Sequence, residues 1–416
     1  MKFYGWVGKY LDVDLTQRTV SVATLDPEFA RKNVGGLGYG TKILSEEIAP
    51  GSDAFNPASP IVFATSPVTA TDVPTSGGYI VINQSPLSQS ISRSEANGFF
   101  GLRLKSAGFD YIVIRGKADR PVYLWVHDDQ AEIRDASAVW GKGSHATEAL
   151  LKAEVGEKNA SVASIGPAGE RLVRYASINS DYGHSATRGG PGAVMGSKNL
   201  KAIVAFGHRQ VPLSDPERTR QLVDEWVRTI KSNETVKNGT MEDASPDHHT
   251  VTKPCYKCPI NHCRWIYLAD QRYGLERADK PEPDTMEGFT EYLGITDIDQ
   301  MLWLHDLADD YGMDIKSLFM AINLMMQAYD NELINLDQLG GVNLKFGDAE
   351  ATSQLMRQIA YREGFSQVLG EDLRTITQTI GGEAAALVKD VKGTGIPLKE
   401  GKGSEVKEES WRPTPE

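Results

Sequence analysis

The chain has 416 residues, with 44 Lys and Arg against 56 Asp and Glu, so its formal net charge is −12 at pH 7. Apolar residues make up 40% and charged residues 24%, which is typical of a globular protein and excludes collagen-like and disordered classes. No apolar run approaches the ~20 residues of a membrane-spanning helix, and the acidic balance argues against nucleic acid as the main partner. The opening MKFYGWVGKYLDVDL shows no secretory signal. We therefore expect a cytoplasmic protein with neither a membrane span nor a nucleic-acid partner.

Short β-rich runs alternate with Gly, Pro and Ser turns through the first 210 residues. These runs are IVFAT (61–65), GYIVIN (78–83), YIVIRG (111–116), VYLWVHD (122–128) and KAIVAFG (201–207). The succession YIVIRG-KADRP-VYLWV is typical of a strand, a short polar turn and a second, paired strand. HATEALLKAEVG (145–156) predicts a helix among the strands.

After residue 210 the pattern becomes helical. Ser214-Asp215-Pro216 is a helix-start signal, because a capping residue precedes a proline in the first turn. Apolar residues then recur at three- and four-residue spacing and predict one apolar helix face: Leu222, Val223, Trp226, Val227 and Ile230. Residues 298–330 and 349–380 show the same kind of pattern. The expected fold class is α+β, in three parts: a β-rich N-terminal domain (1–210), a mainly helical domain (211–398) and a charged, disordered tail (399–416).

All three cysteines fall in one motif, KPCYKCPINHC, in which Cys255, Cys258 and Cys263 have the spacing C-x2-C-x4-C. Thiolates at this spacing can bind one metal centre from a single loop. Iron–sulfur clusters take four thiolates, whereas zinc accepts three cysteines and a histidine, and His262 lies within the motif. The residues alone therefore predict a metal site and leave iron–sulfur and zinc both open.

Of two glycine-rich segments, one predicts helix packing and the other a ligand-binding loop. VGGLGYGTKIL (34–44) has Thr41 where a dinucleotide-binding fingerprint needs glycine, so helix packing is favoured there. TRGGPGAVMGSKNLKAI (187–203) has almost no side chains from Gly189 to Ala193, and such a loop suits phosphates or a large planar cofactor. Positive charge nearby would come from Arg188, Lys198 and Lys201. A tight structural turn is the alternative interpretation.

In these segments and their surroundings, the sequence resembles the tungsten-containing aldehyde ferredoxin oxidoreductase family. The matching stretches are GKYLDVDLTQRTV, FATSPVTATDVPTSGGYIVINQSPLS, ANGFFGLRLKSAGFDYIVIRGKADRPVYLWV and IGPAGERLVRYASINSDYGHSATRGGPGAVMGSKNLKAI, and the match continues to about residue 398. The resemblance implies a β-rich saddle under the pterins, a tungsten (or molybdenum) bis-pterin, an adjacent [4Fe–4S] cluster and Mg²⁺ bridging the pterin phosphates. The implied activity is oxidation of an aldehyde to a carboxylic acid, with electrons passing to ferredoxin.

The resemblance also assigns metal ligands. Cys255, Cys258 and Cys263 match the family's cluster ligands, which favours iron–sulfur over zinc. The backbone carbonyl of Ala186 matches a position that binds the magnesium ion. Glu95 stands where a neutral amide ligand is expected, and a carboxylate is also a suitable magnesium ligand.

Other residues are assigned to the pterin and to proton transfer. Asp309, Gly312 and Asp314 match a pterin-binding loop, for which a helix C-cap at Gly312 is the alternative. Asp284 falls where a glutamate lies near the metal, so it is the candidate for moving protons, with a surface acid as the alternative. His184 is a candidate donor to a cofactor phosphate. The remaining predicted cofactor contacts come from the glycine-rich loop: Arg188, Gly189, Gly190 and Gly192.

Departures from the family pattern define a second hypothesis. A third domain would be expected to supply a fourth cluster cysteine, and this sequence holds three cysteines. The alternative to a working enzyme is therefore a truncated, non-catalytic homologue or subunit that retains at most an iron–sulfur or zinc site. The expected partners are ferredoxin or another electron-transfer subunit, a small aldehyde, a separate polypeptide that completes the site, and a second copy of the chain in a homo-oligomer.

Overall fold

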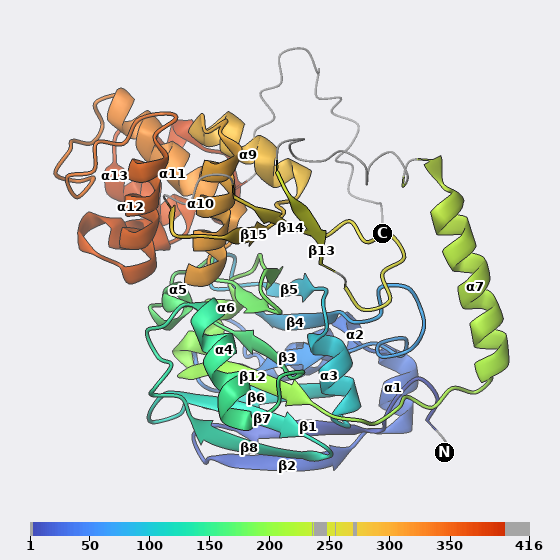
Figure 1. Ribbon diagram of the computed structural model, residues 1–416. Coiled ribbons are helices and arrows are strands. Elements are labelled where there is room, and N and C mark those ends of the chain that lie inside the picture. The colour runs from blue at the N-terminus through green and yellow to red at the C-terminus, as the bar shows by residue number, and fades with distance from the viewer. Residues whose placement is uncertain (1–2, 235, 237–247, 254, 269–272, 396–416) are drawn as a thin grey trace, which may run out of the picture.

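The computed structural model describes residues 3–234, 236, 248–253, 255–268 and 273–395, so the predicted tail at 399–416 lies outside the described residues. Within the described residues, two six-stranded sheets occupy the first half of the chain, and a mainly helical part follows them (Figure 1). The predicted α+β class is confirmed.

The first sheet has the strand order β2-β1-β6-β3-β4-β5. Its pairs are antiparallel except β1 with β6, which run parallel. Helix α2 packs on this sheet at Gly40, where an added Cβ would lie 2.5 Å from the side chain of Ile82, so the predicted packing role of this glycine-rich helix is confirmed. The strands and helices of this part are β1 (Lys9–Asp14), β2 (Thr19–Thr24), α1 (Pro27–Asn33), α2 (Leu37–Glu47), β3 (Ile61–Ala64), β4 (Tyr79–Gln84), β5 (Ile91–Ala96), α3 (Phe100–Ser106) and β6 (Tyr111–Arg115).

The second sheet has the order β11-β10-β9-β12-β7-β8. Strands β6 and β7, which the sequence predicted as a paired unit, both form but belong to different sheets. The reason is a shared core: Ile112 and Ile114 of β6 belong to the same apolar cluster as Val122 and Leu124 of β7. The elements of this part are β7 (Val122–His127), β8 (Gln130–Asp135), α4 (Ser144–Val155), β9 (Ser161–Ser164), α5 (Pro167–Glu170), β10 (Ile178–Ser180), β11 (His184–Ala186), α6 (Pro191–Ser197) and β12 (Leu200–Phe206).

Helix α7 begins where the sequence predicted, because the Asp215 side chain caps it by accepting from the backbone N–H of Arg218. The predicted apolar face of α7 is incompletely covered by the described residues: Leu222 is 48% exposed and Trp226 52% exposed, whereas Val223 is nearly buried. Residues 298–330 form two helices, because Gly312 adopts a left-handed conformation (φ 73°) between them.

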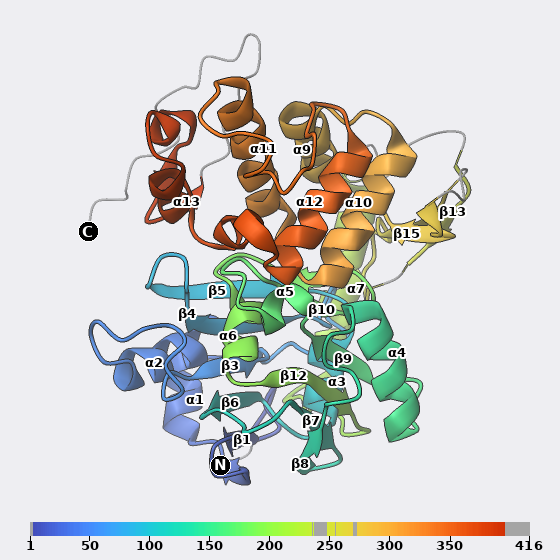
Figure 2. The same ribbon diagram turned by 90° about the vertical axis from the view of Figure 1, so that its left-hand side faces the viewer.

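Helices α10 to α13 stack over one end of the two sheets (Figure 2). Their apolar core extends into the first half of the chain through Val173, Tyr175 and Ala176. Within the described part of the chain, no helix combines the length and apolarity required to cross a membrane. The elements of this part are α7 (Pro216–Ser232), β13 (Thr250–Thr252), β14 (Arg264–Tyr267), β15 (Arg277–Asp279), α9 (Pro283–Leu293), α10 (Ile298–Tyr311), α11 (Ile315–Asp330), α12 (Ala349–Tyr361), η2 (Gly364–Gly370), α13 (Leu373–Ile380), η3 (Ala384–Leu387), β16 (Asp390–Val391) and β17 (Thr394–Gly395).

Candidate functional site

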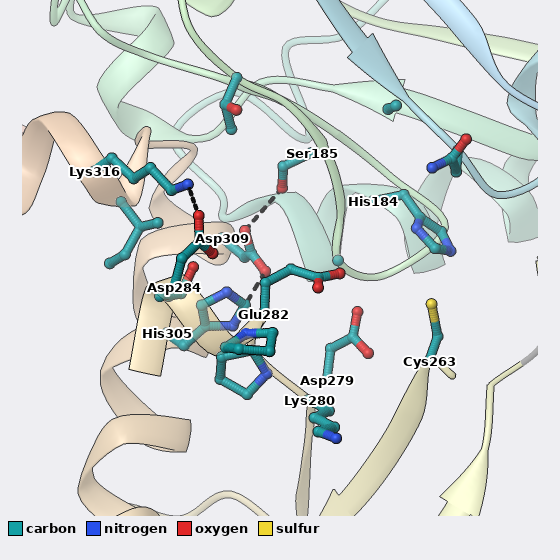
Figure 3. A pocket seen from close by; sticks show the side chains of 18 of the residues that line it. His184, Ser185, Cys263, Asp279, Lys280, Glu282, Asp284, His305, Asp309 and Lys316 are labelled. Carbon is teal, nitrogen blue, oxygen red and sulfur yellow. Dashed lines mark hydrogen bonds and ion pairs between the residues drawn. The ribbon is translucent and has the colours of Figure 1, made fainter. Parts of the chain in front are cut away.

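A cavity of about 920 Å³ lies between the β-rich part and the helical part (Figure 3). One wall comes from β5 and from the segment around β11. The opposite wall comes from α10, from the start of α11 and from the segment that joins β15 to α9, while the cysteine loop closes one end. Cavities of several hundred Å³ with a few convergent polar groups are typical ligand sites. The residues used below that line it are Glu95, His184, Ser185, Arg188, His262, Cys263, Asp279, Asp284, His305, Asp309, Asp314 and Lys316.

The structure brings two of the three predicted cysteine ligands into contact, and all three cysteines are half-buried. The Sγ atoms of Cys255 and Cys263 lie 3.7 Å apart. His184 Nε2 lies 3.7 Å from Cys255 Sγ, and His262 Nε2 lies 3.6 Å from Cys263 Sγ. The shared hydrogen bond between the two thiols lowers the pKa of Cys255 and raises the pKa of Cys263. Burial alone would raise the pKa of Cys258, but hydrogen bonding to His262 and to backbone amides lowers it overall.

The arrangement of the thiols bears on which metal the loop fits. Over the described ranges, no three His, Cys, Asp or Glu side chains converge on a position for one metal ion. A [4Fe–4S] cluster binds each ligand at a different iron, so it does not need such convergence. The Sγ atoms of Cys255 and Cys263 lie close to each other, so the arrangement does not distinguish a cluster from a Cys3His zinc site with His262, and the iron–sulfur assignment stays a prediction that rests on the family resemblance.

The predicted pterin loop lies at the wall of the cavity. Asp309, near the end of α10, accepts a hydrogen bond from Ser185 Oγ at 2.8 Å (Figure 3). Asp314 caps α11 and accepts from Ser317 Oγ at 2.6 Å. Gly312 ends α10, as the C-cap alternative expected. The carboxylates of Asp309 and Asp314 both line the cavity. The assignment of this loop to a pterin stays a prediction.

The glycine-rich loop is packed closely against its own protein. At Gly190, the N-cap of α6, an added Cβ would overlap the carbonyl oxygen of Arg174, and at Gly192 it would overlap that of Ser177. At Gly189 it would overlap Ser92 Oγ. The structural-turn alternative therefore accounts for why these positions are glycine, and their predicted cofactor contacts stay predictions.

The positive charges predicted around this loop divide into two groups. Arg188 lines the cavity, and Ser94 Oγ donates to its carbonyl oxygen at 2.6 Å, which ties the loop to β5. Lys198 and Lys201 are buried. The ammonium of Lys201 pairs with Glu170 at 2.6 Å, and that of Lys198 donates to backbone carbonyls. These two lysines therefore do not offer free positive charge beside the loop, because burial forces each to use its charge within the fold.

The two predicted magnesium positions come from neighbouring strands. Glu95 lies on β5 and lines the cavity, and Ala186 is buried on β11, where it pairs with Ile178 of β10. Strand β11 contacts β5, so the structure brings the two positions to the same side of the cavity.

Among the candidate proton-transfer groups, Asp284 forms an ion pair with Lys316 and its side chain is 57% exposed. A second carboxylate, which the sequence analysis missed, is Asp279 at the end of β15 (Figure 3). Its Oδ2 lies 2.8 Å from Lys253 Nζ, whereas its buried Oδ1 has no hydrogen-bond partner among the described residues. Burial raises the pKa of Asp279, and the Lys253 ammonium opposes that rise. No motif marks Asp279, because it becomes a cavity residue only through a three-residue strand.

Comparison with known proteins identifies the family. Residues 10–207 match the family model "Aldehyde ferredoxin oxidoreductase, N-terminal domain", and residues 219–406 match "Aldehyde ferredoxin oxidoreductase, domains 2 & 3". A tungsten-containing aldehyde ferredoxin oxidoreductase of Pyrococcus abyssi is 37% identical over 97% of this chain and 72% of its own length. An aliphatic sulfonate oxidoreductase, WOR-like subunit, of Pyrococcus furiosus is 30% identical over 94% of this chain and 69% of its own length.

Among solved structures, the active site complex BamBC of benzoyl coenzyme A reductase, in complex with 1,5-dienoyl-CoA, superposes with a TM-score of 0.86 at 28% identity. That match covers 94% of this chain and 66% of the other chain, so the sequence spans about two thirds of this neighbour. Both halves of the fold and nearly the whole sequence are thus matched by one family. The chain belongs to the aldehyde ferredoxin oxidoreductase family, a family of oxidoreductases.

Proposed function

We propose that this chain oxidises an aldehyde to a carboxylic acid at a tungsten (or molybdenum) bis-pterin in the cavity, and that electrons leave through a [4Fe–4S] cluster to ferredoxin. The observation that carries the proposal is that one cavity has Cys263 at one end and the carboxylates of Asp309 and Asp314 on its wall. The names of the relatives are the reason to assign an aldehyde as the substrate.

The residues of the cavity suit the groups that the proposal requires. The carboxylates of Asp309 and Asp314 would accept hydrogen bonds from pterin N–H groups, and Arg188 would offer its charge to a phosphate. Glu95 and the carbonyl of Ala186 would supply oxygen ligands to Mg²⁺. When bound, the cofactor supplies a metal that accepts two electrons and is held by pterin sulfurs. Cys255, Cys258 and Cys263 would hold the cluster.

The residues of this chain would then manage protons. Oxidation of an aldehyde with water to a carboxylic acid releases two electrons and two protons, so the cavity needs a proton acceptor. Asp279 is suited to this role because it is largely buried, has a raised pKa and keeps one oxygen free of hydrogen bonds within the described residues. Asp284, the candidate from the resemblance, is held at the wall by Lys316. General base catalysis by such a carboxylate contributes about 10²–10⁴-fold.

We also propose that a separate polypeptide completes the site. The support is that the P. furiosus relative is named a subunit and that the BamBC structure is a complex. Chromatography of the protein from its native host, followed by identification of co-purifying chains, tests this part. A chain that purifies alone and oxidises aldehydes at full rate would contradict it.

The experiment that tests the function uses the full chain, produced anaerobically with tungstate. Tungsten, molybdenum and iron are measured by mass spectrometry, and aldehyde-dependent reduction of a viologen dye is followed by absorbance. The proposal expects iron, together with tungsten or molybdenum, and dye reduction. Absence of all three metals would overturn it, and iron without dye reduction would favour the non-catalytic subunit. For any variant of a cavity residue, the matched control is His208→Gln, which changes an exposed side chain outside the cavity lining.

A further inference from the structure

Helix α10 carries a histidine one turn before the predicted pterin loop. His305 and Asp309 are four residues apart, so both side chains project from the same face of α10, and both line the cavity (Figure 3). The ring nitrogen His305 Nδ1 lies 3.8 Å from Asp309 Oδ2. The proposed function uses Asp309 but gives His305 no part.

The surroundings of His305 Nδ1 indicate which ring nitrogen carries hydrogen. Nδ1 is buried without a hydrogen-bond partner among the described residues, and the side chain as a whole is 15% exposed. An unprotonated Nδ1 would turn its lone pair toward the Asp309 carboxylate and repel it, whereas an Nδ1–H group turns a positive hydrogen toward it. The contact therefore favours the neutral tautomer with hydrogen on Nδ1.

Asp309 is anchored by the first half of the chain. Its Oδ1 accepts a hydrogen bond from Ser185 Oγ at 2.8 Å. Its backbone carbonyl oxygen accepts from Ser144 Oγ at 2.7 Å and from the side-chain amide of Asn179. These contacts fix the backbone and one carboxylate oxygen, and His305 faces the other oxygen, Oδ2.

We propose that His305 is a positioning residue for Asp309: its Nδ1–H group directs Oδ2 so that the carboxylate accepts hydrogen bonds from the N–H edge of the pterin ring. The inference rests on the pterin of the proposed function. The 3.8 Å separation is longer than a hydrogen bond, and a movement of about 0.9 Å closes it. A carboxylate oxygen accepts two hydrogen bonds, so Oδ2 can receive one from His305 and one from the pterin.

The role makes a quantitative expectation for cofactor retention. At metal sites, groups that orient a ligand residue generally change affinity about 10–100-fold when they are removed. We expect a loss of the same order for the pterin when the Nδ1–H donor of His305 is removed. A variant that restores a donor at the position of Nδ1 should restore retention.

The first arm of the test needs neither cofactor nor activity. The full-length chain is labelled with ¹⁵N-histidine in a host that makes no pterin cofactor, and the His305 resonances are those that disappear in His305→Asn. At alkaline pH, where the imidazole is neutral, NMR should find hydrogen on His305 Nδ1. In Asp309→Ala, with an unchanged circular dichroism spectrum, His305 should revert to the Nε2–H form that histidine prefers in water.

The second arm measures how fast pterin leaves protein made with tungstate, by the fluorescence of the oxidised pterin after dialysis. His305→Leu should release pterin about 10–100-fold faster than the wild type. His305→Asn should retain it, because the amide nitrogen of asparagine occupies nearly the position of Nδ1. The control His208→Gln, which changes an exposed histidine, should behave as the wild type.

The outcomes separate this inference from the proposed function. An Nε2–H tautomer in the wild type, or an Nδ1–H tautomer that persists in Asp309→Ala, would overturn the positioning role. Wild-type retention in His305→Leu, or equal loss in His305→Leu and His305→Asn, would overturn it as well. Each of these results leaves the pterin in place, whereas absence of pterin from the wild type would overturn the inference together with the proposed function.

Discussion

The contact between His145 of α4 and Asp306 of α10 joins the β-rich part of the chain to the helical part. His145 Nε2 lies 3.1 Å from Asp306 Oδ1, and both side chains are largely buried. Burial alone would lower the pKa of His145, but the hydrogen bond and the charge of Asp306, with the charges of Asp310 and Asp309, raise it to about 9. We predict that this contact makes stability fall with rising pH.

The magnitude follows from linkage. The pKa of His145 rises from its ordinary value of 6.5 to about 9, and each unit corresponds to about 1.4 kcal/mol, so the protonated pair contributes up to about 3 kcal/mol. Between these two pKa values the folded state binds more protons at His145 than the unfolded state does. The contribution is therefore fully present below pH 6.5 and is lost as pH rises through about 9.

Urea unfolding of wild type and His145→Gln, followed by tryptophan fluorescence between about pH 6 and pH 10, measures the effect. At the acid end the variant should be less stable by about 3 kcal/mol, and the difference should largely vanish at the alkaline end. The control His208→Gln removes an exposed histidine that also lies near an aspartate, and it should change stability by less than about 0.5 kcal/mol at every pH. A constant difference between wild type and His145→Gln across this range would refute the reasoning.

Three further predictions concern packing, buried charge and catalysis. Gly40→Val should lower the free energy of unfolding by about 1–3 kcal/mol, because its side chain would collide with Ile82; wild-type stability in a urea titration would contradict this. Lys201→Met removes the nearer of the two cations beside the buried Glu170, the other being Arg171 at 3.8 Å, and should cost about 3–5 kcal/mol, measured in the same way; a loss below about 1 kcal/mol would show that the pair is dispensable. Asp279→Asn should lower the rate of aldehyde oxidation by about 10²-fold or more with unchanged tungsten and iron content; equal loss of metal and rate would instead indicate a structural role.

Features that depend on local sequence were predictable. Strands β3, β4 and β12 form where β-branched runs are bounded by turn residues, and Asp215 caps α7 because the capping residue and the proline lie next to each other in sequence. The break at Gly312 was expected only as an alternative. Gly312 fits both a helix C-cap and a pterin-binding loop, and the spacing of residues in the sequence does not distinguish these two roles.

Features that depend on tertiary contacts were not predictable. The separation of β6 and β7 into two sheets is decided by a core formed from both, and alternation of apolar residues looks the same in either arrangement. The charge of Lys201 is neutralised by Glu170, a partner 31 residues away, which no local pattern indicates. The sequence therefore did not show whether the lysine side chains near the glycine-rich loop point toward the cavity or into the fold.

The candidate site was predictable only in part. The cysteine spacing and the family resemblance named Cys255, Cys258 and Cys263, and the structure places His184, which the sequence offered only as a candidate phosphate donor, beside Cys255. Asp279 lies at the site because it ends a short strand that the sequence did not predict. His184 and Asp279 come from segments outside the cysteine motif, one before it and one after it, brought together by the packing of the two parts of the chain.

The central claim is that the cysteine loop holds an iron–sulfur cluster at one end of the cavity. Iron and acid-labile sulfide, measured in anaerobically purified wild type and in the triple variant Cys255→Ser, Cys258→Ser, Cys263→Ser, test it most directly. The account predicts about four irons and four sulfides per wild-type chain and essentially none in the variant, whose circular dichroism spectrum should otherwise match. Stoichiometric zinc with no iron in the wild type, or iron that remains in the triple variant, would contradict it.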